Sequence, residues 1–185
     1  MVKEKIPQNK DDKENQVKAG DKQEKVLKYE ELCKLINQAI KEGDTNKVES
    51  LVNQKRPWLE DLGHFLANAS RNGDLETVKL LSKEVPDKFN YTSCLWQAAN
   101  QGHLNIIRFL LDKTEIDTQE LDRLTMEALV DDQLEVVKFL FDNKGVKLLD
   151  NDGQAKKSFF QYAIGNSPSF EILDYLMSRW EKEKN

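Results

Sequence analysis

The sequence of 185 residues has little cysteine, proline or glycine, and each shortage excludes a class of structure. Two Cys in so long a chain exclude a disulfide scaffold, while eight Gly and four Pro exclude collagen-like and Gly/Pro-rich chains. No uncharged apolar run reaches the roughly 18–20 residues of a membrane span, and the first residues lack the apolar core of a signal peptide. We therefore expect a soluble protein in a reducing, cytoplasmic compartment.

Basic charge does not predominate either. The formal net charge is -5, and 33% of the residues are charged. Binding to the nucleic-acid backbone requires a basic surface, so we expect no nucleic-acid partner.

Residues 1–28 differ in composition from the rest of the chain. Lysine and acidic residues alternate there, with no aromatic residue and only scattered apolar ones. Such a segment cannot bury enough apolar surface to offset the entropy lost on ordering. We expect a disordered charged tail over 1–28 and a folded domain over 29–185. The tail is either a solvated segment, a tether or a targeting segment, and its residues do not select one.

One pattern recurs five times in residues 29–185. An alanine marks each copy, at Ala39, Ala69, Ala98, Ala128 and Ala163. A second apolar anchor follows in each copy, at Val48, Val78, Ile107, Val137 and Leu173. Both anchors keep one register, which indicates a repeat protein. The expected repeats cover residues 31–56, 61–85, 91–113, 121–144 and 156–181.

Each copy predicts two short helices. Apolar residues at i, i+3 and i+4 give each helix one apolar face. The first helix ends at a glycine, which enters the left-handed conformation without strain, at Gly43, Gly73 and Gly102. Asp44 and Asp74 follow as N-caps of the second helix. One hairpin cannot bury both faces, so we predict an all-α solenoid of about five stacked helix-turn-helix repeats.

The third copy, Leu95–Leu111, carries the centre Ala-Ala-Asn-Gln-Gly-His and resembles an ankyrin repeat, as does the second copy at residues 69–81. The resemblance covers about residues 30–180 and implies a module that binds proteins. The repeats are divergent, because the central steps are 29 and 30 residues where ankyrin repeats have about 33. The Thr-Pro opening is also absent. These departures predict short or missing β-turn fingers and shift the expected binding surface to the concave face of the first helices.

Copy four is irregular at its turn. Asp132 stands where the other copies have glycine, and Gln133 stands where a cap is expected. A non-glycine residue in the left-handed region costs about 1 kcal/mol, and glutamine caps poorly. We expect this hairpin to be looser or to turn differently, and Asp132→Gly to stabilise it.

Residues that carry chemistry are few. His64, His103, Cys33 and Cys94 are scattered over the repeats, so they predict no zinc site, and no phosphate-binding loop is present. Both cysteines fall at apolar helix positions and are expected in the core. We expect no catalytic, cofactor or metal site. Separation in the sequence does not exclude a Cys–His pair that meets in the fold. An enzyme that uses Cys94 or His103 is therefore the third hypothesis.

The candidate binding residues form two series on the first helices. The position before each anchor alanine holds Gln38, Asn68, Gln97, Glu127 and Tyr162. The position two beyond it holds Lys41, Arg71, Asn100, Val130 and Gly165. We interpret them as a groove for a peptide or helix of a partner protein; the alternative is a merely hydrated surface. Trp58, in the connector after copy one, is either a packing staple, which we favour, or an exposed binding anchor.

The first hypothesis is a non-catalytic adaptor, scaffold or inhibitor that is a monomer on its own. The second is a secreted effector of an intracellular bacterium, acting in the host cytosol, because such effectors often carry divergent ankyrin-like repeats. The 23 Lys against 5 Arg indicate an AT-rich genome, which an AT-rich eukaryote or a large virus fits equally well.

Overall fold

The computed structural model describes residues 28–55, 57–149, 159, 161, 165 and 169–184. Within these residues the chain forms helices joined by short connectors, with no β-strand. The helices are residues 28–42, α2 Thr45–Gln54, α3 Leu59–Asn72, α4 Leu75–Leu81, α5 Thr92–Asn100, α6 Leu104–Leu111, α7 Thr118–Val130, α8 Leu134–Asn143 and α10 Phe170–Lys184.

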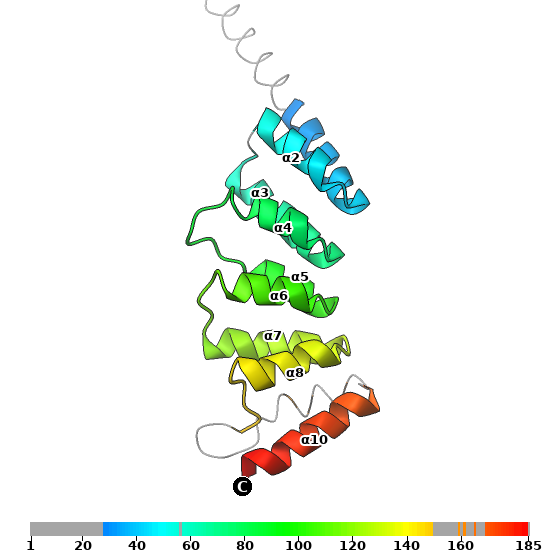
Figure 1. Ribbon diagram of the computed structural model, residues 1–185, viewed down its shortest axis with the longest axis vertical. Coiled ribbons are helices and arrows are strands. Elements are labelled where there is room, and N and C mark those ends of the chain that lie inside the picture. The colour runs from blue at the N-terminus through cyan, green and yellow to red at the C-terminus, as the bar shows by residue number, and fades with distance from the viewer. Residues whose placement is uncertain are drawn as a thin grey trace, which may run out of the picture.

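The helices pair into hairpins that stack in a row along the chain (Figure 1). In each pair the first helix packs on the second, as α3 does on α4, α5 on α6 and α7 on α8. The first helices α3, α5 and α7 also contact one another in order, more extensively than the second helices α2, α4 and α6 do. The predicted all-α helical solenoid is confirmed. We call the exposed sides of helix 28–42, α3, α5 and α7 the first-helix face.

The connectors between hairpins contain no strand among the described residues, and the one between α4 and α5 contains a turn in which the Phe89 amide donates to Pro86 O at 2.9 Å. This agrees with the expectation of short or missing β-turn fingers. The first helices of copies one, two and four begin at 28, Leu59 and Thr118, slightly before the repeat limits drawn from the sequence. The predicted tail lies outside the described residues, apart from Lys28, which is already helical.

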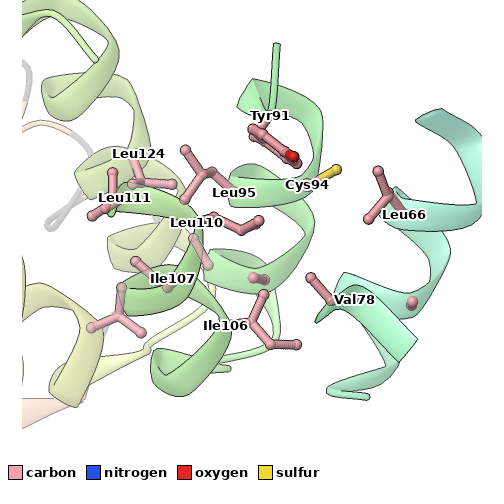
Figure 2. Packing of buried hydrophobic residues seen from close by; sticks show 14 of the residues in the cluster. Leu66, Val78, Tyr91, Cys94, Leu95, Ile106, Ile107, Leu110, Leu111 and Leu124 are labelled. Carbon is pink, nitrogen blue, oxygen red and sulfur yellow. The ribbon is translucent and has the colours of Figure 1, made fainter. Parts of the chain in front are cut away.

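The anchor residues of the repeat form the centre of the core. Both series have an exposed fraction of 0% in copies one to four: Ala39, Ala69, Ala98 and Ala128, and Val48, Val78, Ile107 and Val137. Figure 2 shows that Cys94 of α5 points toward Leu66 of α3, while Leu95 of α5 points the other way, toward Leu124 of α7. A methyl side chain at the alanine position lets successive first helices approach closely. Ala163, the anchor of copy five, lies outside the described residues.

The turn inside each hairpin has the predicted left-handed residue. Gly43, Gly73 and Gly102 have φ of 71°, 77° and 73°. The amide of Gly73 donates to Ser70 O at 3.4 Å, and the next amide donates to Ala69 O at 3.1 Å, which closes the helix end. Asp44 and Asp74 cap the second helices as expected, because their carboxylates accept from the amides of residues 47 and 77.

Copy four turns in the same way, so the expectation of a different turn is wrong. Asp132 adopts φ 56°, and the amide of Gln133 donates to Ala128 O at 2.8 Å, as in the other copies. The Asp132 carboxylate accepts from the Ser169 amide at 2.8 Å, a bond to the following hairpin that the sequence did not reveal. This bond partly offsets the strain of the left-handed conformation.

Polar side chains at the turns bind the preceding hairpin. Asn72 Nδ2 donates to Ile40 O at 3.2 Å, and Gln133 Nε2 donates to Asn100 O at 3.2 Å. The His103 ring bonds through Nε2 to Arg71 O at 3.0 Å, so it contacts the backbone at the turn of the preceding copy. Each bond reaches a carbonyl in the last turn of a first helix, where carbonyls lack the usual helical partner, although Ile40 O also accepts from the Gly43 amide at 3.1 Å.

The glycine turns allow a matched test of this arrangement. A Cβ at Gly73 would lie 2.6 Å from the His103 ring, whereas a Cβ at Gly43 would meet nothing within 4 Å. Both substitutions to alanine strain the left-handed backbone by about 1–2 kcal/mol. We therefore expect Gly73→Ala to lower the free energy of unfolding, measured in urea, by more than Gly43→Ala does. Equal losses would show that His103 does not occupy the space over Gly73.

Asp132 allows a second test. Asp132→Gly relieves about 1 kcal/mol of strain but removes the bond to Ser169, which is worth about as much, so we expect a change within about 0.5 kcal/mol. Asp132→Asn keeps the acceptor, tolerates the left-handed region and removes a negative charge near the C-terminus of α7. We expect Asp132→Asn to raise the thermal unfolding midpoint. A lower midpoint for Asp132→Asn would contradict this account of the turn.

Candidate functional site

Four of the five residues that precede the anchor alanines lie side by side on the first-helix face. Gln38 and Asn68 are exposed, and Gln97 and Glu127 are half-buried. The fifth, Tyr162, lies outside the described residues. Because each side chain leaves the same turn of its helix, the four form a row with one member per hairpin.

The second predicted series lies nearly one turn further along the same helices. Lys41 and Arg71 are exposed, Asn100 is half-buried, and Val130 is 37% exposed. Gly165 is exposed as well. The two series therefore share one surface. The second series changes from cationic in copies one and two to uncharged in copies three and four, and the first series carries the acidic Glu127 in copy four.

Some of these side chains connect neighbouring hairpins. Asn68 Nδ2 donates to Asn37 Oδ1 at 2.9 Å, across from α3 to helix 28–42. With its amide oriented as a donor, Asn100 reaches Glu127 Oε2 at 3.2 Å, from α5 to α7. Asn37 was not among the predicted site residues, although its place directly before Gln38 is a signal for the same face of the helix. These residues therefore contribute to the stacking of hairpins as well as to the surface.

Other side chains in the two series serve no such purpose. Within the described part of the chain, the side chains of Lys41, Arg71 and Gln97 make no hydrogen bond or ion pair. Gln38 donates only to Glu42, within its own helix, at 2.7 Å. The stacking of the hairpins does not require these four polar groups, so they are available to a ligand.

Trp58 combines features of both interpretations weighed for it. Its ring stacks on Tyr29, with 4.5 Å between centroids and 26° between planes, yet 66% of the residue is exposed. Its amide donates to Tyr29 Oη at 2.6 Å, and Tyr29 Oη donates to Asp61 Oδ2 at 2.8 Å. Tyr29 is buried, and burial raises the pKa of its hydroxyl. Trp58 is thus held in place on one side and open to solvent on the other, and its role in binding stays a prediction.

A groove of about 620 Å³ lies beside the row, between α3 and α5. Small side chains at Gly63, Ala67 and Ser93 leave the space, and Leu59 and Phe89 line it with apolar surface. Leu59 is 49% exposed. Sequence analysis missed this groove; the signal was a glycine inside a helical pattern, four residues before an alanine.

Cys94 also lines this groove, but its thiol is poorly suited to act as a nucleophile. The residue is 1% exposed, and burial raises the pKa of its thiol to about 11. Burial raises the pKa of Cys33 as well. The reactive form of cysteine is the thiolate, so at neutral pH Cys94 is held in its unreactive form.

The described residues hold no group of three or more His, Cys, Asp or Glu side chains that could bind a metal ion. None of their helices has the length and apolar character required to cross a membrane.

Comparison with protein families gives one match. The family model described as ankyrin repeats (3 copies) matches residues 36–122 and 64–152, which together span more than half of the chain. The search of curated proteins found no match.

The burial of Cys94 predicts a pH effect on stability. The pKa of its thiol is about 11 in the folded protein against an ordinary 9.0, so the unfolded chain loses this proton first. The stabilisation is complete below about pH 9 and is lost as the pH rises to about 11. We expect the free energy of unfolding in urea to fall over this interval, and to fall less steeply, by about one proton, in Cys94→Ala. Equal slopes for the two proteins would contradict the assignment.

Proposed function

Since this chain belongs to the ankyrin-repeat family, we propose that it is a non-catalytic module that binds another protein through the first-helix face. Ankyrin repeats are generally protein-interaction modules, and stacked repeats offer extended binding surfaces. The proposed role is that of an adaptor, scaffold or inhibitor.

The observation that carries the proposal is a set of polar side chains on the first-helix face that the fold itself does not use. Lys41, Arg71 and Gln97 are positioned by three successive first helices and make no hydrogen bond or ion pair among the described residues. A partner segment that crosses the helices would meet one such residue per hairpin.

Apolar surface next to the row supports the same proposal. Leu59 and the groove between α3 and α5 supply contact area, and Trp58 is exposed near the start of α3. Tryptophan and arginine are the residues most enriched where protein interfaces gain their affinity. Trp58 and Arg71 are therefore the proposed main contributors to the affinity.

The absence of catalysis and the location belong to the proposal too. The protonated thiol of Cys94 supports a non-catalytic role over the Cys–His enzyme. A cytoplasmic location fits the reduced cysteines, Cys33 and Cys94. The narrower role of a bacterial effector in a host cytosol rests on the divergent repeats and on the ratio of lysine to arginine, a ratio that an AT-rich eukaryote or a large virus fits equally well.

The first-helix face can be tested by capture of partners from a lysate with the full-length chain. We expect Gln38→Ala/Arg71→Ala/Gln97→Ala to lose the partner, because it removes contacts without breaking a bond between hairpins. A control variant, Glu49→Ala/Lys83→Ala/Glu135→Ala, changes exposed residues outside the first helices and should retain it. Mass spectrometry reads the captured proteins.

Retention by the first variant together with loss by the control would place the site outside the first-helix face. Capture of nothing by the parent chain would contradict the binding role.

A further inference from the structure

We propose that the first two hairpins recognise an acidic segment of the partner protein, with Lys41 and Arg71 as its principal contacts. This inference rests on the proposed function and specifies the chemistry of the ligand. It concerns the part of the first-helix face formed by helix 28–42 and α3.

These two helices carry the same arrangement of side chains. Lys34, Gln38 and Lys41 follow one another at i, i+4 and i+7 on helix 28–42. On α3 the equivalent residues are His64, Asn68 and Arg71. All six are exposed. We call this group the cationic patch.

The hydrogen bonds between the helices hold the two halves of the cationic patch in register. The Asn68–Asn37 bond of 2.9 Å and the bond from Asn72 to Ile40 O at 3.2 Å connect α3 to helix 28–42. Seven residues span about 10 Å of helix, and packed helices lie about 8–10 Å apart. Lys34, Lys41 and Arg71 therefore stand near three corners of a square with sides of about 10 Å, and His64 occupies the fourth.

The cations of this patch have no carboxylate partner of their own. Within the described residues Lys34, Lys41 and Arg71 form no ion pair. Glu42, which follows Lys41 directly in the sequence, already accepts from Gln38 and pairs with Lys47 at 3.5 Å. An acidic ligand would supply the missing partners.

The patch contrasts with the charge of the domain around it. Residues 29–185 contain 20 Lys and Arg against 27 Asp and Glu, a net charge of -7. In the later hairpins, Asn100 and Val130 stand at the position of Lys41 and Arg71. Arg123 stands at the position of Lys34 and His64, and it pairs with Glu120 at 3.1 Å. A long polyanion such as nucleic acid would be repelled by the domain, whereas a short acidic segment meets only the patch.

The groove between α3 and α5 borders the patch on one side and adds a second requirement for the ligand, an apolar side chain. His64 belongs to the patch and also lines the groove, whose other walls include Leu59 and Ala67. An extended segment rises about 3.3 Å per residue, so acidic residues three positions apart match the 10 Å between cations. The expected ligand has two such acidic residues followed by an apolar side chain.

Selection from a displayed library of random short peptides on the immobilised full-length chain tests this inference. We expect the parent chain to enrich peptides rich in Asp and Glu. Lys41→Glu/Arg71→Glu should enrich Lys and Arg instead, and should bind an acidic peptide selected by the parent about fivefold more weakly. The control Lys83→Glu/Lys147→Glu makes the same change in net charge outside the patch and should keep the parent preference.

The outcomes separate the two proposals. Enrichment without acidic residues, or an acidic preference that the charge reversal leaves unchanged, overturns the acidic ligand but leaves the binding role. No enrichment of any peptide by the parent contradicts the binding role itself. A fluorescent single-stranded oligonucleotide that binds more tightly than the selected peptides would show that the patch serves nucleic acid. Far-ultraviolet circular dichroism of each variant confirms that the helices remain folded.

Discussion

The close approach of successive first helices is the constraint on which the rest of the structure depends. A single hairpin of this chain has an apolar face on each side and can cover only one of them. Burial of the alanines at Ala39, Ala69, Ala98 and Ala128 lets each first helix pack directly on the next. Any larger side chain there would push the hairpins apart and expose the apolar anchors of the second helices. The distance between successive hairpins is therefore determined by these alanine side chains.

The same constraint produces the candidate binding surface. When first helices are held in register, residues at one position of the repeat must line up, which is why Gln38 and Asn68 are neighbours although 30 residues separate them. Small residues between α3 and α5 leave a groove beside the row, and turn residues such as His103 fix each hairpin on the one before it. The core, the turns and the surface are thus three consequences of one repeat spacing.

Much of the fold could be predicted because its signals are local and recur. The left-handed glycines, the Asp44 and Asp74 caps and the buried anchors each depend on a few neighbouring residues. Copy four shows where such reasoning stops. Asp132 and Gln133 look unsuited to their turn, yet they bond to Ser169 and Asn100, which lie more than 30 residues away. The candidate site was predictable in its positions but not in its bonds, since Asn68 and Asn37 meet only across two hairpins.

The sequence by itself determined the stack of helical hairpins, the register of the repeat and the membership of a family of repeat proteins. Those properties follow from periodicity and from turn residues, which act over a few positions. Only the tertiary structure decided which polar side chains are already bonded within the protein and which are free. Trp58 is open on one side because Tyr29 covers the other, and Arg71 is free because no carboxylate of the described chain reaches it. Whether a surface residue is available to a partner depends on neighbours that are distant in the chain, so only the packed structure reveals it.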